Sequence, residues 1–106
     1  MKMHDRERDV ESYFNRKVEA LGLKIYKFIP DCRNGMPDRL VTLPDSRVVW
    51  VEMKTVGGRL SELQKLRHHE LAASGQVVLT VWTKEQADEV VEQLRRMLVG
   101  QNRKTS

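Results

Sequence analysis

The chain has 106 residues, of which 40% are hydrophobic and 32% are charged, with a formal net charge of +4 and a sequence pI of about 9.5. This length predicts one domain and excludes a second core, and the periodic hydrophobic content excludes a disordered chain. One cysteine, Cys32, allows no intramolecular disulfide and indicates no structural zinc site, while no apolar run approaches the ~18 residues of a membrane span. We therefore expect a cytoplasmic, non-membrane protein whose basic excess suits an anionic partner.

The first half of the chain predicts one helix and three strands. Residues 5–21 carry apolar side chains at helical spacing, and Gly22 follows as a helix stop. Residues 23–30 predict a strand that ends at a proline, before a segment rich in turn formers. Residues 38–43 and 47–55 predict two further strands. The connection between these two strands is so short that we expect an antiparallel hairpin.

The second half predicts a helix, a strand and a helix. Ser61 and Gln64 match a capping box that opens a helix running to about residue 74. Residues 77–82 form a continuous apolar run that suits a strand in the interior of a sheet. The last helix has the clearest apolar stripe in the chain, from Ala87 to Leu98, and opens with a second capping-box pattern at Thr83 and Gln86.

These elements define an α/β fold in the order α-β-β-β-α-β-α, with a mixed β-sheet flanked by helices. The third strand, the second helix and the fourth strand form a crossover, which should be right-handed and make the two strands parallel. We expect a single domain over residues 1–100, followed by a frayed polar tail over residues 101–106.

The most apolar strand leads directly into charges. Val48–Val51 is followed by Glu52, Met53 and Lys54, and alternation along a strand places Glu52 and Lys54 on the same face. A buried, unpaired ion is costly, so this pair must face a cleft, pair internally or hold a metal. A simple ion pair on a sheet face is the plain alternative.

Asp38 strengthens the case for a site. It begins the strand that pairs with the Glu52 strand, so the two carboxylates can converge at one end of the hairpin. Two carboxylates beside an ammonium group form an oxygen-ligand site of the kind that Mg²⁺ or Mn²⁺ occupies.

These motifs resemble those of a nuclease superfamily. "MPD", followed fourteen residues after Asp38 by "EMK", resembles the PD-(D/E)XK motif, and the element order resembles the restriction-endonuclease-like core. The stretches "GMPDRLV", "VVWVEMKT" and "GRLSELQKLRHHEL" are similar to a VRR-NUC (virus-type replication-repair nuclease) domain of the stand-alone phage or bacterial type. The resemblance covers residues 5–98, although the chain contains no V-R-R tripeptide.

The resemblance implies a role for each matching residue. Asp38 and Glu52 correspond to the metal-binding carboxylates, and the Met53 carbonyl to the main-chain ligand between Glu and Lys. Lys54 corresponds to the lysine that orients the attacking water or stabilises the developing charge. Glu11 corresponds to the acidic residue of the first helix, as a catalytic and metal-binding group.

Several residues keep alternative interpretations. Gln64 corresponds to the family's catalytic glutamine, yet it is also the expected capping partner of Ser61, and one side chain cannot serve both roles fully. Glu11 can equally be a solvated helix residue. His68 and His69 are adjacent on a helix and cannot share a face, so we expect both on the surface. Candidate DNA-contacting residues, which can equally form a solvated basic face, are Arg33, Arg39, Arg59, Lys65 and Arg67.

The resemblance implies a divalent-metal-dependent, structure-selective DNA endonuclease that leaves a 5′-phosphate and a 3′-hydroxyl. Branched or flapped DNA is the expected substrate, and a homodimer acting as a Holliday-junction resolvase in DNA repair would suit a four-way junction. If the chain is phage-encoded, it would act in the host cytoplasm. One alternative is a non-catalytic DNA-binding or assembly module that retains the fold. Another is a structural protein whose Glu52 and Lys54 form only an ion pair and which has no metal affinity.

Overall fold

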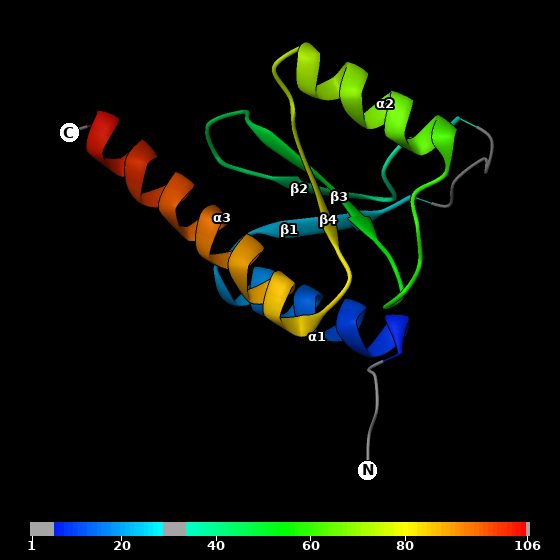
Figure 1. Cartoon of the computed structure of the whole chain (residues 1–106). Helices are drawn as coiled ribbons and strands as arrows, with labels where there is room; N and C mark the ends of the chain where they lie inside the picture. Colours follow the sequence, from blue (N-terminus) through cyan, green and yellow to red (C-terminus); the bar gives the residue numbers. More distant parts are fainter. Residues whose placement is uncertain (1–5, 29–33, 106) are drawn as a thin grey trace.

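The computed structural model describes residues 6–28 and 34–105, with side chains up to residue 100. Cys32 and Arg33 therefore lie outside the described residues. The elements are α1 (Glu7–Ala20), β1 (Lys24–Lys27), β2 (Arg39–Thr42), β3 (Val48–Met53), α2 (Glu62–Ala73), β4 (Val77–Val81) and α3 (Lys84–Thr105). Their order, α-β-β-β-α-β-α, confirms the predicted order (Figure 1). In the described part of the chain, no helix is long and apolar enough to cross a membrane.

The four strands form one mixed sheet in the order β1-β2-β3-β4. β1 pairs with β2 and β2 pairs with β3 in antiparallel fashion, while β3 and β4 are parallel. The predicted hairpin and the predicted parallel crossover are therefore both confirmed. A parallel pair needs a long connection, and α2 supplies it between β3 and β4.

Two predictions about the second half of the chain are wrong in detail. β4 is an edge strand of the described sheet, not an interior one. Its apolar run does not require neighbouring strands on both sides, because helices cover the two faces of the sheet beside it. The expected frayed tail is also helical, since α3 continues to Thr105.

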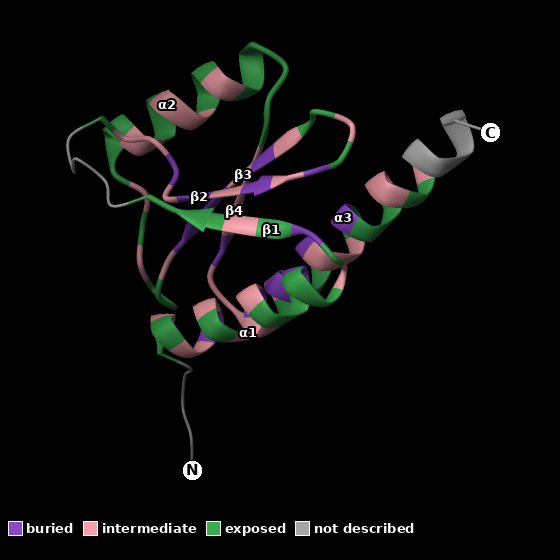
Figure 2. Cartoon of the chain, turned by 180° about the vertical axis from the view of Figure 1, so that it is seen from behind, coloured by how far each residue is buried: buried purple, intermediate pink, exposed green. Residues whose placement is uncertain are grey.

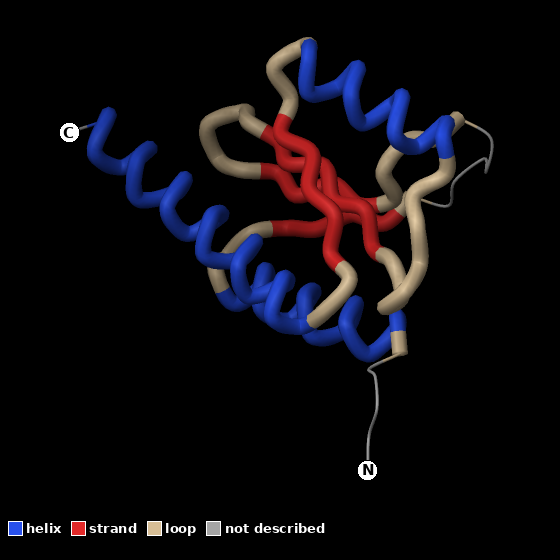
Figure 3. The backbone as a smooth tube through the Cα atoms, in the orientation of Figure 1, coloured by secondary structure: helices blue, strands red, loops and turns tan. Residues whose placement is uncertain are grey.

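The helices divide unequally between the two faces of the sheet. α1 and α3 lie side by side on one face, and α2 lies on the other, as Figures 1 and 3 show. The hydrophobic core lies between the sheet and the α1/α3 layer, because alternation along the strands directs their most apolar side chains to that face. The buried core residues are Val10, Phe14, Val18, Leu23, Val41, Leu43, Val49, Val51, Met53, Val81, Ala87, Val90 and Leu94.

The α2 layer is packed more lightly than the α1/α3 layer. None of the twelve residues of α2, all of them described, is buried, and Figure 2 shows the helix as exposed or intermediate along its length. Leu66 is 50% exposed. α2 therefore turns a largely polar face toward the side of the sheet that carries Trp50 and Glu52, and the candidate site lies between them.

Candidate active site

Asp38 and Glu52 meet at one end of the β2–β3 hairpin. The register pairs Arg39 with Val51, so Asp38 stands beside Glu52 in the next position along. The Met53 N–H donates a hydrogen bond to Asp38 Oδ1 at 3.1 Å, which fixes the carboxylate against the end of β3. In an extended strand, the N–H and C=O of one residue point toward the same neighbouring strand. The Met53 carbonyl therefore faces the Asp38 side.

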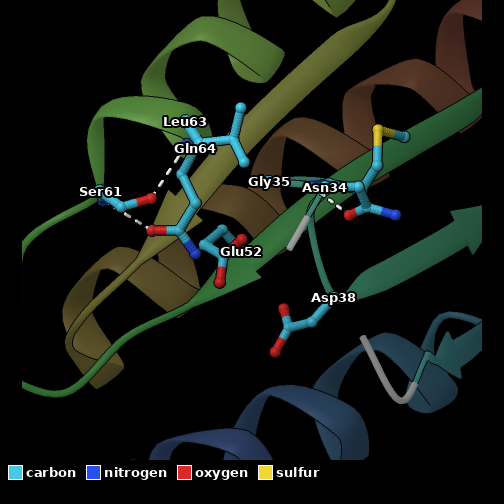
Figure 4. A pocket seen from close by; sticks show the side chains of 8 residues that line it. Asn34, Gly35, Asp38, Glu52, Ser61, Leu63 and Gln64 are labelled. Carbon is cyan, nitrogen blue, oxygen red and sulfur yellow. Dashed lines mark hydrogen bonds between the residues drawn. The ribbon is translucent and has the colours of Figure 1, made fainter. Parts of the chain in front are cut away.

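The two carboxylates line a cavity of about 180 Å³. Its walls come from the loop before β2, the end of β3 and the first turn of α2 (Figure 4). Gly35 allows the loop to approach α2 this closely: its φ is +73°, and a Cβ there would lie 2.6 Å from the Leu63 carbonyl oxygen. The lining residues are Asn34, Gly35, Met36, Asp38, Glu52, Ser61, Leu63 and Gln64.

The Glu52 carboxylate is buried without a full set of partners. The residue is 5% exposed, and no described residue hydrogen-bonds to its Oε1 atom. Burial, followed by the negative charge of Asp38, raises the pKa of Glu52 to about 7, although the positive charge of Lys54 opposes that rise. A carboxylate oxygen that is desolvated, unpaired and next to a second carboxylate is a site that favours a cation.

His68 faces this oxygen, so the prediction that it lies on the surface is wrong. Its side chain is 14% exposed, and its Nε2 lies 3.7 Å from Glu52 Oε1. Burial, together with the nearby charge of Lys54, lowers the pKa of His68. The adjacent His69 is exposed, as expected. A usable signal was the spacing of Gln64 and His68, which are one helical turn apart and share the face of α2 that meets the site.

Arg39 is buried beneath the site and does not belong to an exposed DNA-contacting surface. It is 2% exposed, and its Nη1 donates to Asp38 Oδ2 at 2.6 Å. Its Nη2 donates to Glu11 Oε1. A phosphate outside the protein cannot reach a guanidinium that two carboxylates already enclose, so we remove Arg39 from the candidate DNA contacts.

Glu11 pairs with two basic side chains beneath the cavity. Besides Arg39, Lys27 Nζ lies 3.6 Å from Glu11 Oε1. Glu7, one turn earlier on α1, was missed by the sequence analysis, although its spacing from Glu11 places both on one helix face. Burial raises the pKa of Glu7, with further contributions from Glu11 and Asp38. In this structure Glu11 contacts Arg39 and Lys27, and its role as a metal ligand stays a prediction.

Gln64 makes the predicted capping box and also lines the cavity. Its Oε1 accepts a hydrogen bond from the Ser61 N–H at 2.8 Å, and its own N–H donates to Ser61 Oγ at 3.1 Å. The side chain lies beside Glu52 in Figure 4, at the same cavity. Its catalytic role stays a prediction.

The remaining basic candidates for DNA contacts differ in exposure and in the partners that they already have. Arg59 is exposed in the loop after β3, and Lys65 is exposed on α2, where it pairs with Glu62 at 3.0 Å. Arg67 Nε donates to the Asn34 carbonyl at 2.6 Å, which ties α2 to the loop beside the cavity. DNA contacts of these three residues stay predictions.

The donor set fits a hard divalent cation. No three His, Cys, Asp or Glu side chains within the described ranges are grouped closely enough to hold a metal by themselves. Mg²⁺, however, is usually bound through one or two carboxylates and several waters. Asp38, Glu52 and the Met53 carbonyl provide that kind of set, and the buried Glu52 carboxylate lacks a full set of hydrogen-bond partners.

Comparison with known proteins agrees with this geometry. Residues 2–83 match the model of the VRR-NUC domain family. The chain is 36% identical over 76 residues to "Putative nuclease p44" of Acyrthosiphon pisum secondary endosymbiont phage 1, covering 72% of this chain and 82% of that protein. A solved structure described as "VRR_NUC domain" superposes with a TM-score of 0.72 and 31% identity, covering 81% of this chain and 94% of the other. The α/β fold, the two converging carboxylates and these matches establish that the chain belongs to the VRR-NUC nuclease family.

Proposed function

We propose that this protein is a divalent-metal-dependent, structure-selective DNA endonuclease that hydrolyses phosphodiester bonds. The observation that carries the proposal is the Glu52 carboxylate, buried with an unpartnered oxygen at a cavity that it shares with Asp38. An ion pair with Lys54 alone would not require a second carboxylate at the same place. A non-catalytic module would not require a buried charge that lowers the stability of the fold.

Each residue has a distinct role in the proposed site. The oxygens of Asp38 and Glu52 and the Met53 carbonyl would hold Mg²⁺ or Mn²⁺. When bound, such an ion supplies Lewis-acid stabilisation of the phosphate and a more acidic water. Lys54 follows β3 and places its charge near Glu52, where it can orient the attacking water or neutralise charge that develops on the phosphate.

The neighbouring residues shape the site. Arg39 holds Asp38 from below through its contact with Oδ2, and Glu11 holds Arg39 in turn. Gln64 would contact the substrate or the attacking water from the α2 side of the cavity. Its amide nitrogen can do so while its oxygen remains in the capping box, so the two roles are compatible.

For the substrate, we propose branched or flapped DNA, cut to leave a 5′-phosphate and a 3′-hydroxyl. Phosphate contacts from Arg59, Lys65 and Arg67 would place the backbone across the cavity. A homodimer would present two equivalent sites related by two-fold symmetry, which matches the two scissile strands of a Holliday junction. Such a dimer would nick both strands symmetrically.

Cleavage of labelled four-way junction, flap, duplex and single-stranded DNA tests this proposal. Wild-type protein would be compared in Mg²⁺, Mn²⁺ and EDTA with Glu52→Gln and Lys54→Met. Glu92→Gln is the matched control, because Glu92 lies on α3 and pairs with Arg95. We expect metal-dependent cleavage that both site variants lose and the control retains, with a nick that DNA ligase can reseal.

Two other outcomes would decide against parts of the proposal. DNA binding without cleavage of any substrate in either metal would leave the non-catalytic module as the better interpretation. Light scattering could show that the cleaving protein is a monomer, or the junction could be nicked asymmetrically. Either result would refute the dimeric resolvase and would still support the endonuclease.

A further inference from the structure

Two buried polar atoms face each other between the sheet and α2 without a hydrogen bond. Glu52 Oε1 and His68 Nε2 are 3.7 Å apart, and neither has a hydrogen-bond partner among the described residues. Buried polar groups in native proteins are almost always satisfied, so an opposed pair of this kind calls for a physical explanation.

The separation is close to, but longer than, that of a hydrogen bond. An N–H···O hydrogen bond spans ~2.7–3.2 Å, so an approach of about 0.5 Å would form one. That approach is inexpensive, because no residue of the fully described helix α2 is buried against the sheet. A small movement of the helix therefore breaks little apolar packing.

His68 can present an N–H to Glu52, because its Nε2 is the ring nitrogen that faces the carboxylate. A neutral imidazole carries one N–H, and the nitrogen that faces a carboxylate oxygen is the one that gains most from carrying it. An ionised carboxylate accepts such a bond strongly.

The two side chains come from elements that are otherwise weakly joined. Glu52 ends the apolar run of β3, whereas His68 lies in the second turn of α2, one turn after the capping residue Gln64. A bond between them would fix the carboxylate rotamer and hold α2 over the cavity at the same time. Hydrogen bonds to ligating carboxylates act in this way on metal sites.

We propose that His68 is a positioning residue that donates a hydrogen bond from Nε2 to Glu52 and so orients this carboxylate for a divalent metal ion. The inference rests on the proposed metal-dependent function and deepens it. His68 touches neither substrate nor metal in this arrangement. Its effect is transmitted through Glu52.

Mn²⁺ binding by the full chain, followed from the electron paramagnetic resonance signal of free Mn²⁺, tests the proposal without relying on activity. His68→Leu removes the donor and keeps apolar volume, whereas His68→Gln keeps an amide N–H near the position of Nε2. His69→Leu is the matched control, since His69 is the exposed neighbour on the same helix. We expect His68→Leu to weaken Mn²⁺ binding about 10- to 100-fold. His68→Gln should restore most of the affinity, and His69→Leu should match the wild type.

Thermal unfolding in EDTA checks that the variants remain folded. If His68→Leu does not fold, His68→Asn serves instead, because its amide is too short to reach Glu52. Unchanged Mn²⁺ affinity in a folded donor-less variant would overturn the inference while leaving the nuclease intact. A ¹⁴N coupling on bound Mn²⁺ that disappears in His68→Leu would also overturn the inference, because it would show that His68 is a direct metal ligand. Wild-type protein that neither binds Mn²⁺ nor cuts DNA would instead refute the proposed function itself.

Discussion

Replacing Glu52 by glutamine should stabilise the metal-free protein at neutral and alkaline pH. The pKa of Glu52 is raised from 4.5 to about 7, chiefly by burial. Between these pH values the unfolded chain has released the proton that the folded chain still holds. The stability contributed by this group is therefore fully present below pH 4.5 and is lost as the pH rises to about 7.

The size of the effect follows from the same values. At ~1.36 kcal/mol per pH unit, a rise from 4.5 to about 7 corresponds to about 3 kcal/mol of stability lost by the wild type. Glutamine has the same shape and no charge, so it avoids this loss. With an m-value of ~2 kcal/mol per molar urea, the unfolding midpoint of Glu52→Gln should exceed that of the wild type by about 1.5 M at pH 8.

Urea unfolding in EDTA at pH 4.5, 6 and 8 measures the difference, and the comparison between pH values cancels any constant effect of the amide. Glu92→Gln should change stability in the opposite direction, because the Arg95 side chain, together with Arg96, lowers the pKa of Glu92 to about 2. A stability difference for Glu52→Gln that stays constant between pH 4.5 and pH 8 would refute the conclusion that burial raises the pKa of Glu52 in the folded, metal-free protein.

Three further substitutions test how the site is held together. Arg39→Met should cost about 3–5 kcal/mol in urea unfolding, because it removes the buried guanidinium that pairs with both Asp38 and Glu11. Arg59→Met, at an exposed position, should change stability by less than about 0.5 kcal/mol. Gly35→Ala should lower Mn²⁺ affinity as well as stability, since its Cβ would meet the backbone of α2. Gly57 also has a positive φ but has open space around it, so Gly57→Ala should lower stability alone. Ser61→Ala should lower stability by about 1 kcal/mol through loss of the N-cap bond, measured by urea unfolding; an unchanged midpoint would contradict that role.

The hairpin at the site was predictable from residues 38–55 alone. Alternation along a strand puts Glu52 and Lys54 on one face, and a short connection leaves few ways to pair the two strands. These local rules allow Asp38 and Glu52 to converge, and the register observed in the structure brings them together. The Ser61 capping box was equally accessible, because its two bonds join residues three positions apart.

The residues that surround the carboxylates come from distant parts of the chain, so local sequence patterns did not predict them. Arg39 and Glu11 are 28 positions apart, and nothing in the segment around Arg39 distinguishes it from an exposed arginine. β4 has the composition of an interior strand, yet it lies at the edge because strand order depends on the whole sheet.

The placement of His68 shows the same division most directly. The sequence by itself determined that α2 is a helix and that His68 and His69 point in different directions. The tertiary structure alone decided which of the two faces Glu52, because the rotation of α2 over the sheet depends on the packing of its sparse apolar residues and of the loop held by Arg67. Local hydrogen bonding fixes secondary structure, whereas burial and the pairing of charges arise when separate elements meet.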